Sequence, residues 1–305
     1  MIEKRMAKFL VVISGPTGIG KTAVSIKVAQ HFCTEIVSCD SRQIYRELSI
    51  GTAVPSPEEL SAVPHHFIHS HSVRESYNAS RYETEALQLL EKLFLKNNIL
   101  LLVGGSMLYV DAICKGIDAM PDADLEIRAT LKKQLEQEGL ESLRLQLKQL
   151  DPEYYQNVDL KNPNRIVHAL EISLLTGKPY SSFLSKTPKE RPFNILKIGL
   201  NCDREILHRR INLRVDQMVE NGLIAEARKL YPYRSLNALN TVGYRELFSF
   251  FDGDISREKA IELIKRNSRR YARKQLTWFR RDDEMQWFEP GQIPEIIDCI
   301  SQRIV

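Results

Sequence analysis

The chain has 305 residues, of which 43% are hydrophobic, and its formal net charge is +4. A chain of this length can bury a sizeable core, and so mild a net charge does not by itself indicate a nucleic-acid partner. Five scattered cysteines without a C-x-x-C pair argue against a cysteine zinc site and a disulfide framework, and no apolar stretch approaches the length of a membrane span. We therefore expect a soluble protein of the reducing cytoplasm.

The first predicted strand, Phe9 to Ile13, runs into a glycine-rich loop that a helical pattern follows as far as Phe32. Strand, loop and helix in this order are typical of a phosphate-binding P-loop, in which backbone N–H groups and the positive end of the helix surround the phosphates. Lys21 adds a positive charge, and the Thr22 hydroxyl is placed to bind Mg²⁺. The loop, with the spacing G-x-x-x-x-G-K-T, consists of Gly15, Pro16, Thr17, Gly18, Ile19, Gly20, Lys21 and Thr22.

A second buried strand is predicted over residues 35–39, and Asp40 follows it directly. Ligands bind at the carboxyl ends of parallel strands, so we expect Asp40 on the same side of the sheet as the P-loop. Position alone leaves three roles open for this carboxylate. It could be a general base, a group near Mg²⁺ through water, or the N-cap of a following helix.

Residues 51–80 are rich in Pro, Ser and His and are predicted to form a long loop of the kind that is usually functional. A metal site is one interpretation of the histidine cluster His65, His66, His69 and His71. The H-H-x-x-H-x-H spacing differs from the helical zinc arrangement, and no cysteine is nearby, so polar packing within the loop is favoured.

A helix over residues 82–95 and a strand over residues 99–103 are predicted next. The strand is the longest continuous apolar run in the chain, which is typical of a central parallel strand. Gly104 and Gly105 follow it and allow close approach of the backbone to a ligand, and Ser106 offers a hydroxyl there.

Further along the chain the composition changes to charged helical patterns, and a fourth core strand is predicted only at residues 193–200. A turn at Asn164 and Arg165 precedes a helix over residues 165–175. These elements predict an α/β fold: a P-loop NTPase-like parallel sheet core, residues 1–117 and 161–305, with a helical insertion domain, residues 118–160, and a basic helical C-terminal segment.

The helix predicted over residues 204–221 contains Arg204, Arg209, Arg210 and Arg214. In P-loop phosphotransferases such arginines neutralise charge on the phosphates, although a solvated basic face is an equal alternative here. The strongest charge asymmetry lies between Arg257 and Arg281, where ten basic residues stand against two acidic ones. On a helix, Arg266, Arg269, Arg270, Arg273 and Lys274 form one stripe, which favours a polyphosphate backbone such as RNA over a merely solvated face.

The order of these motifs closely resembles the tRNA dimethylallyltransferases, also called isopentenyltransferases. The resemblance covers residues 9 to about 281. Its motifs are the P-loop, Asp40-Ser41-x-Gln43-x-Tyr45, Gly51-Thr52-Ala53, Pro64-His65-His66, Gly104-Gly105-Ser106-x-Leu108-Tyr109, Asn164-Arg165, Arg214-Val215-x-x-Met218, Gly243-Tyr244-Arg245 and Lys274-Gln275-x-Thr277-Trp278-x-Arg280.

The resemblance implies transfer of a dimethylallyl group from dimethylallyl diphosphate to N6 of the adenosine just 3′ of the anticodon, with release of diphosphate. It implies catalytic roles for Lys21, Thr17, Asp40 as general base and Arg214, with Mg²⁺ as the cofactor held at Thr22. The insertion domain would cover the anticodon stem-loop, and the enzyme is expected to be a monomer. The residues expected to contact tRNA are Asp40, Ser41, Arg42, Gln43, Ser106, Asn164, Arg165, Gly243, Tyr244, Arg245, Lys274, Gln275, Thr277, Trp278, Arg280 and Arg281.

Two residues depart from the family pattern: Ser106 stands where threonine is usual, and Val54 where lysine is common. Three alternatives remain. The P-loop alone suggests ATP binding and therefore a small-molecule kinase. Such a kinase does not need the basic C-terminal stripe. A prenyltransferase that acts on free adenine nucleotides does not need it either. An RNA-binding module with an idle P-loop leaves Asp40 and Arg214 without a role.

Overall fold

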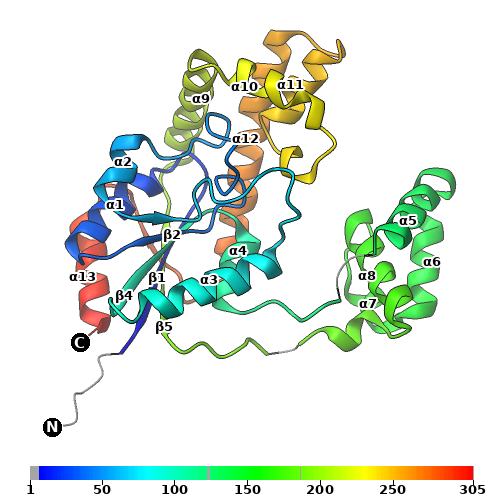
Figure 1. Ribbon diagram of the computed structural model, residues 1–305, viewed down its shortest axis with the longest axis horizontal. Helices are drawn as coiled ribbons and strands as arrows, with labels where there is room; N and C mark the ends of the chain where they lie inside the picture. Colours follow the sequence, from blue (N-terminus) through cyan, green and yellow to red (C-terminus); the bar gives the residue numbers. More distant parts are fainter. Residues whose placement is uncertain (1–6, 122–123, 186, 305) are drawn as a thin grey trace. The chain divides into compact units, whose positions relative to one another are not determined.

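The computed structural model describes residues 7–121, 124–185 and 187–304. They form two compact units (Figure 1). The first unit runs to Lys115 and resumes at Glu190, and the second spans Gly116–Lys189. Each unit has its own hydrophobic core.

A six-stranded parallel sheet lies at the centre of the first unit, in the order β3-β2-β4-β1-β5-β6. This order confirms the predicted α/β fold. It brings β2, β4, β1 and β5 side by side, so the segments that follow these strands meet at one edge of the sheet. The strands are β1 (Phe9–Ser14), β2 (Ile36–Ser38), β3 (His65–His66), β4 (Ile99–Gly104), β5 (Asn194–Leu200) and β6 (Gln286–Phe288).

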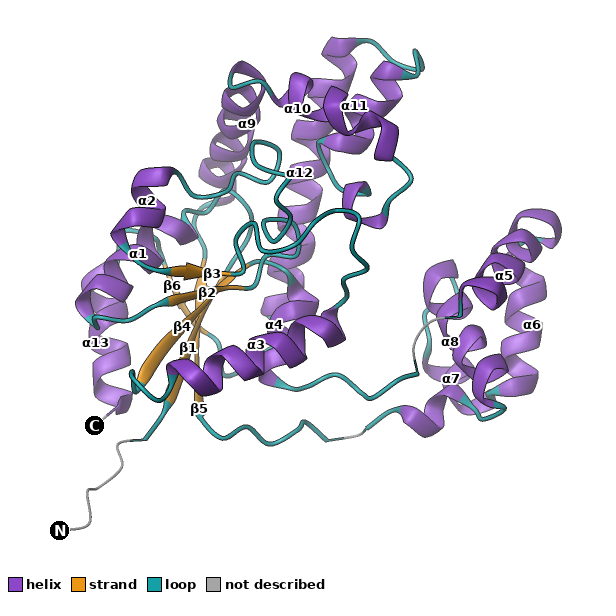
Figure 2. Cartoon of the chain, in the orientation of Figure 1, coloured by secondary structure: helices purple, strands orange, loops and turns teal. Residues whose placement is uncertain are grey.

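The central strands are buried on both faces because their residues are apolar without interruption. Leu10 and Val12 of β1 face one core, whereas Val11 and Ile13 face the other. Helices α3 and α4 cover the first face, and α1 and α13 cover the second (Figures 1 and 2).

The helices of the first unit follow the strands and the long connections between them. They are α1 (Lys21–His31), α2 (Pro57–Ala62), α3 (Ala79–Leu93), α4 (Met107–Cys114), α9 (Arg204–Glu220), α10 (Leu223–Leu230), α11 (Tyr244–Phe251), α12 (Arg257–Phe279) and α13 (Ile293–Ile304). Short 3₁₀ turns η2 (Tyr231–Tyr233) and η3 (Asn237–Leu239) connect α10 to α11. The expected long loop at residues 51–80 is thus interrupted by α2 and β3, whose patterns are too short to stand out in the sequence.

The second unit is helical, as predicted, but it is longer than the expected insertion of residues 118–160. It contains α5 (Leu125–Glu138), α6 (Leu140–Leu150), α7 (Pro152–Asn157), α8 (Pro163–Thr176) and η1 (Tyr180–Phe183). The boundary at residue 160 is wrong because α8 contributes Ile166 and Leu170, both fully buried, to the core that Leu143 and Leu147 of α6 also form. The helix expected at residues 165–175 therefore belongs to this unit and not to the sheet core.

In the described part of the chain, no helix is both long enough and apolar enough to cross a membrane.

The separate cores predict that the two units respond independently to cavity-creating substitutions. Leu143→Ala should destabilise the second unit by about 2–5 kcal/mol, because a fully buried leucine is removed. Hydrogen exchange should accelerate in α5, α6 and α8 and stay unchanged in β1 and β4. Leu102→Ala, in β4, should give the opposite pattern, and equal acceleration in both units by either variant would contradict two independent cores.

Candidate active site

Two adjoining hollows lie at the carboxyl edge of the sheet. The inner chamber, of about 200 Å³, is lined by Thr17, Asp40 and Ser106, by residues 241–243 and by residues of α9, α10 and α12. The outer chamber, of about 850 Å³, is lined by the P-loop residues Gly18, Gly20 and Thr22 and by the segment from Ser49 to Leu60. Arg214 and Met218 of α9 line both chambers, so the two hollows meet at this helix.

The P-loop has the local geometry that the sequence predicts. Gly20 has a φ of 103°, in the left-handed region that favours glycine, and α1 begins at the next residue. The first turn of α1 contains no acidic side chain that would oppose an anion. Ile19 is the exception among the expected phosphate contacts, because its side chain is fully buried in the core and only its backbone faces the loop.

Lys21 folds back over the P-loop and donates hydrogen bonds to the carbonyl oxygens of Gly15 and Pro16, both at 2.9 Å. Burial lowers the pKa of its ammonium group to about 8, and the charge of Asp40 opposes part of this shift. Burial also lowers the pKa of Arg214. The charges of Asp40 and of Glu59, which lines the outer chamber, oppose this second shift. Two cations that are partly desolvated beside the P-loop suit a phosphorylated ligand.

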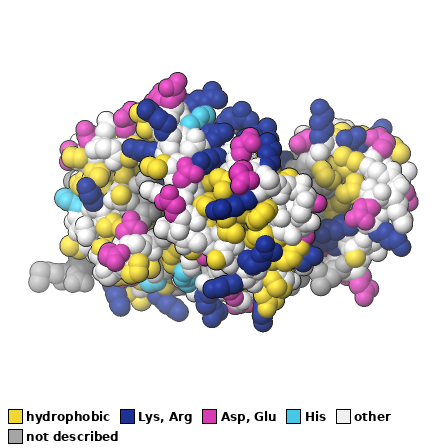
Figure 3. All heavy atoms as spheres, turned by 90° about the horizontal axis from the view of Figure 1, so that it is seen from above, with side chains coloured by type: hydrophobic (Ala, Val, Ile, Leu, Met, Phe, Trp, Pro, Cys, Tyr) yellow, Lys and Arg dark blue, Asp and Glu magenta, His cyan; other side chains and the backbone are white. Residues whose placement is uncertain are grey.

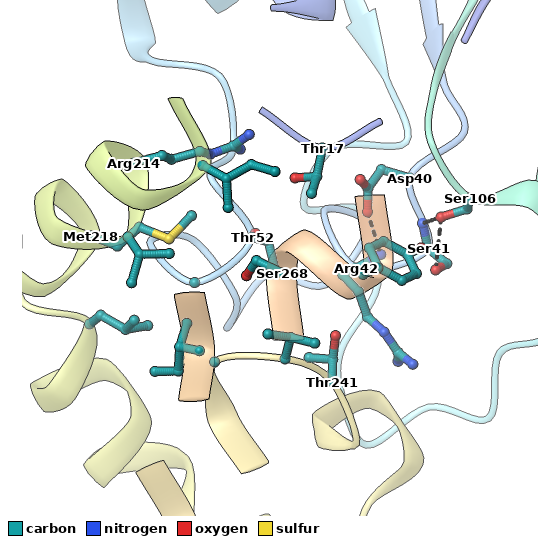
Figure 4. A pocket seen from close by; sticks show the side chains of 18 residues that line it. Thr17, Asp40, Ser41, Arg42, Thr52, Ser106, Arg214, Met218, Thr241 and Ser268 are labelled. Atoms are coloured by element: carbon teal, nitrogen blue, oxygen red, sulfur yellow. Dashed lines mark hydrogen bonds between the residues drawn. The ribbon is translucent and has the colours of Figure 1, made fainter. Parts of the chain in front are cut away.

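Asp40 lies on the wall of the inner chamber with Thr17, while Arg214 and Met218 lie across it (Figure 4). Its Oδ1 accepts hydrogen bonds from the backbone N–H groups of Arg42, at 2.8 Å, and Gln43, at 3.2 Å. The carboxylate therefore caps a turn and not a helix, and within the described chain no residue hydrogen-bonds to Oδ2. Capping and proton transfer are compatible roles for the two oxygens.

The inner chamber has one polar and one apolar wall. On the polar wall the Ser106 hydroxyl accepts a hydrogen bond from the backbone N–H of Ser41, at 2.8 Å, and donates to the Ser41 hydroxyl, at 3.0 Å. Arg42 lies beside them and donates to the carbonyl oxygen of Ala238, at 3.0 Å. The apolar wall is formed by Ile211, Val215, Met218, Leu223, Val242 and Ile264.

Gln275 was expected to contact RNA, but in this structure its side chain is engaged inside the protein. Its side chain is only 2% exposed and bridges two loops at the sheet edge. Its carbonyl oxygen accepts from the backbone N–H of Thr17, at 2.9 Å, and its amide donates to the carbonyl oxygen of Gly105, at 2.7 Å. Both halves of the amide are engaged inside the protein, so Gln275 joins α12 to the P-loop.

Tyr244 was also expected to contact RNA, but it is fully buried. Its hydroxyl donates to Glu226 Oε1, at 2.6 Å, and its ring lies against Gly51, where a Cβ would come within 2.6 Å of the tyrosine oxygen. Tyr244 therefore holds the chain at Gly51, and only glycine allows so close an approach. Gly243, beside it, lines the inner chamber, whereas Arg245 is exposed on α11.

Glu226 of α10 is a structural residue that the sequence analysis missed. Its carboxylate accepts hydrogen bonds from the backbone N–H groups of Ser49, Ile50 and Gly51, at 2.8–3.1 Å, as well as from Tyr244. Gln43 fixes the next part of the same segment by donating to the carbonyl oxygens of Thr52 and Ala53. Gly51 and Thr52 line the inner chamber while Ile50 and Ala53 line the outer one, so this segment is the wall between them.

The remaining expected RNA contacts do not gather at the chambers. Lys274, Thr277 and Arg280 are exposed on or beside α12. Trp278 is half-buried and donates from its indole nitrogen to Asp111 Oδ2, at 2.9 Å, and Arg281 stacks on its ring. Asn164 and Arg165 lie exposed at the start of α8, in the second unit.

Each histidine of the cluster makes a polar contact within the protein. His66 pairs with Glu35, at 2.7 Å, and His71 pairs with Glu85, at 3.2 Å. His65 hydrogen-bonds to the carbonyl oxygen of Val63, and His69 to the hydroxyl of Ser49. Among the described residues no three His, Cys, Asp or Glu side chains are grouped to hold a metal. Polar packing, the favoured interpretation, fits these contacts. Val54, which replaces the usual lysine, lines the outer chamber and brings no charge to it.

A family model described as IPP transferase matches residues 43–282. Among curated proteins, tRNA dimethylallyltransferase 1 of Bacteroides fragilis (strain YCH46) is 55% identical over 298 residues, which cover 98% of this chain and 99% of that protein. The tRNA dimethylallyltransferase of Christiangramia forsetii is 54% identical over 300 residues, with 98% and 99% covered.

Solved structures give the same result. The full-length tRNA isopentenylpyrophosphate transferase from Bacillus halodurans is 37% identical with a TM-score of 0.73, and 97% of each chain is covered. A eukaryotic dimethylallyltransferase acting on tRNA is 26% identical with a TM-score of 0.80, covering 97% of this chain and 77% of that one.

The lowered pKa of Lys21 predicts that anion binding depends on pH. Because its ammonium group loses a proton near pH 8, affinity for inorganic diphosphate should fall about tenfold between pH 7 and pH 9 relative to a Lys21→Met variant. Calorimetric titration measures the diphosphate affinity of wild type and of Lys21→Met across this pH range. Subtracting the two binding free energies removes the effect of the ionisation of diphosphate itself. Lys27→Met, exposed on the same helix, should behave as wild type, and a constant difference between wild type and Lys21→Met would contradict the prediction.

The contacts of Glu226 predict that it stabilises the wall between the chambers. Glu226→Gln replaces a carboxylate that accepts four hydrogen bonds with an amide that has a single acceptor oxygen, so the amides of Ser49 to Gly51 should exchange about 10–100-fold faster. Tyr244→Phe, which spares the three backbone bonds, should have a smaller effect. Unchanged exchange at these amides in Glu226→Gln would show that the carboxylate does not hold the segment.

Proposed function

We infer that this chain, which belongs to the IPP transferase family as its motifs predict, is a tRNA dimethylallyltransferase. It moves a dimethylallyl group from dimethylallyl diphosphate to N6 of the adenosine 3′-adjacent to the anticodon and releases diphosphate. The observation that carries the proposal is the meeting of two chambers at Arg214, one lined by the P-loop and the other by Asp40. The leaving group can therefore lie on one side of the reacting carbon while the acceptor approaches from the other.

The diphosphate would bind at the P-loop side, where Lys21 and Arg214 supply the charge. As the allylic C–O bond breaks, its electron pair leaves with the diphosphate oxygen, and negative charge grows there. Cations already desolvated at that point stabilise this charge without first giving up bound water. The backbone N–H groups at the start of α1 add fixed dipoles of the same sign.

The residues at the P-loop fit a magnesium ion. Thr22 lines the outer chamber, and its hydroxyl forms no hydrogen bond to another described residue, so it is available as an oxygen ligand. Few further protein ligands are needed, because Mg²⁺ in such sites is held mainly by phosphate oxygens and water. When bound, the ion would neutralise part of the charge that develops on the departing diphosphate.

Asp40 would be the catalytic base. The N6 lone pair forms the new C–N bond, and the proton that the amine loses passes to the Asp40 carboxylate, whose Oδ2 is not occupied by the turn. The adenine reaches this position only after leaving its stack, because a base within the anticodon loop cannot enter a chamber of about 200 Å³ with its neighbours. Ser41, Ser106 and Thr17 offer the hydrogen-bonding groups on its polar wall.

Neither of the other enzyme classes accounts for both the P-loop and the basic face of α12. A kinase needs a phosphate acceptor at the P-loop, but the basic face of α12 has no role in such a reaction. A prenyltransferase that acts on free adenine nucleotides does not need that face either. An RNA-binding module without catalysis leaves the two partly buried cations, Lys21 and Arg214, without a role.

Two further features belong to the proposal. The second unit, Gly116–Lys189, with Asn164 and Arg165, would contact the anticodon stem-loop. Both chambers are lined by one chain, so a single copy suffices and the enzyme would act as a monomer. All five cysteines are free, which fits a reducing cytoplasm.

The direct test supplies Mg²⁺, dimethylallyl diphosphate labelled in the prenyl group and unmodified tRNA. Label should enter the adenosine beside the anticodon. Asp40→Asn, which keeps an oxygen to cap the turn, should lower kcat by about two orders of magnitude or more and leave the Kd for tRNA unchanged.

Asp203→Asn, at the N-cap of α9 and outside both chambers, serves as the control and should retain activity. Transfer of a γ-phosphate from ATP to a small molecule, with no label in tRNA, would overturn the proposed function. Wild-type turnover by Asp40→Asn would remove Asp40 from the role of base.

A further inference from the structure

Gln275 is the polar member of an otherwise apolar face of α12. The buried residues of this helix are Ala260, Ile264, Ala272, Gln275 and Phe279. Arg273 and Lys274, which precede Gln275, are exposed, and Figure 3 shows Lys and Arg side chains gathered on the surface that is seen from above. An amide on the buried face is unfavourable unless its donor and its acceptor both find partners, so the partners of Gln275 indicate what it does.

The amide of Gln275 continues the pairing of two adjacent strands beyond the point where the strands end. β1 and β4 pair in parallel as far as Ser14 and Gly104. Gln275 lies between the loops that follow them: it accepts from the backbone N–H of Thr17, at 2.9 Å, and donates to the carbonyl oxygen of Gly105, at 2.7 Å. A side-chain amide thus takes the place of the next ladder hydrogen bond and joins the P-loop to the segment after β4.

This amide fits closely among the groups that surround it. A Cβ at Gly105 would come within 2.4 Å of Gln275 Nε2 and within 3.1 Å of the carbonyl oxygen of Gly15. That Gly15 oxygen also accepts a hydrogen bond from Lys21, at 2.9 Å. Gln275 therefore lies against the part of the P-loop that binds the ammonium group of Lys21, with little room to move.

The bond between Thr17 and Gln275 fixes the direction of the Thr17 side chain. Because the backbone N–H of Thr17 points to Gln275, its side chain is turned toward the inner chamber, whereas the rest of the loop lines the outer one. Figure 4 shows the Thr17 hydroxyl between Asp40 and Arg214. This hydroxyl makes no hydrogen bond to another described residue, so it can donate to a ligand in the chamber.

We propose that Gln275 is a positioning residue of the transfer reaction, which holds the Thr17 hydroxyl at the diphosphate oxygen from which the allylic carbon departs. The inference rests on the proposed function. As the C–O bond breaks, its electron pair stays on that oxygen, and the hydroxyl donates a hydrogen bond to it while keeping its proton. A displacement of about 1 Å at such a group can lower a rate about 100-fold, which is why the loop needs a rigid support.

The test is a double-mutant cycle on kcat. Gln275→Met has a similar length but no amide, so the Thr17 hydroxyl loses its fixed position and kcat should fall about 10–100-fold. The KM for dimethylallyl diphosphate and the Kd for tRNA should stay within about threefold of wild type, because the bond to the departing oxygen strengthens only as the reaction proceeds. Thr17→Val removes the hydroxyl itself. The double variant should match Thr17→Val in kcat within about twofold, since Gln275 acts through that hydroxyl.

Losses of kcat that multiply in the double variant would overturn the proposal, because Gln275 would then act independently of Thr17. So would an unchanged kcat with a raised Kd for tRNA, which would assign Gln275 to RNA binding. Failure of the wild-type protein to label tRNA would overturn the proposed function instead, since the cycle compares variants of an active enzyme.

Two further variants separate positioning from folding. Phe279→Leu changes another buried residue on the same face of α12, about one helical turn further along, and should reduce stability while leaving kcat within about twofold of wild type. Gly105→Ala keeps the glutamine but pushes its amide aside, so it replaces Gln275→Met in the cycle if that variant does not fold. Its loss of kcat should likewise vanish in the Thr17→Val background, and a loss that persists there would contradict the proposal.

Discussion

The active site depends on holding the charge of Lys21 in a partly buried position beside the P-loop. Burial lowers the pKa of this ammonium group, and Arg214 lies close by with its own guanidinium desolvated. Asp40 is the carboxylate whose charge opposes both shifts. Such an arrangement is costly when empty and favourable when an anion with more than one charge binds. The P-loop, the start of α1 and the turn at Asp40 are all positioned around this requirement.

Polar side chains within the protein hold these loops in place, and several of them come from distant parts of the chain. Gln275 connects the P-loop to the end of β4, and Glu226 with Gln43 fixes the segment from Ser49 to Ala53. Ala53 has a φ of 47°, a conformation that a non-glycine residue keeps only when its surroundings impose it. The walls of both chambers are thus fixed before substrate binds, which lowers the reorganisation needed during reaction.

Local patterns explain how much could be predicted from the sequence. Three strands are continuous apolar runs, and they precede the P-loop, Asp40 and Ser106 in turn. Chain order and parallel pairing bring the carboxyl ends of these strands together. The motifs identified the family because their residue types and their order along the chain can be read directly from the sequence. The direction of a side chain is different, because it depends on partners that may be hundreds of residues away. Gln275 and Thr17 are separated by 258 positions, so the motif that contains Gln275 gave no sign that its amide points inward. The end of the second unit was missed for a similar reason, since the partners of α8 become clear only when helices pack.

The central claim is that the P-loop of this protein holds a leaving group and not a phosphoryl donor. Dimethylallyl diphosphate carrying ³²P in its β-phosphate tests this claim most directly when it is incubated with Mg²⁺ and unmodified tRNA. All released label should be inorganic diphosphate, formed in equal amount to the prenylated adenosine. Label recovered in tRNA, or in orthophosphate as the first product, would contradict it.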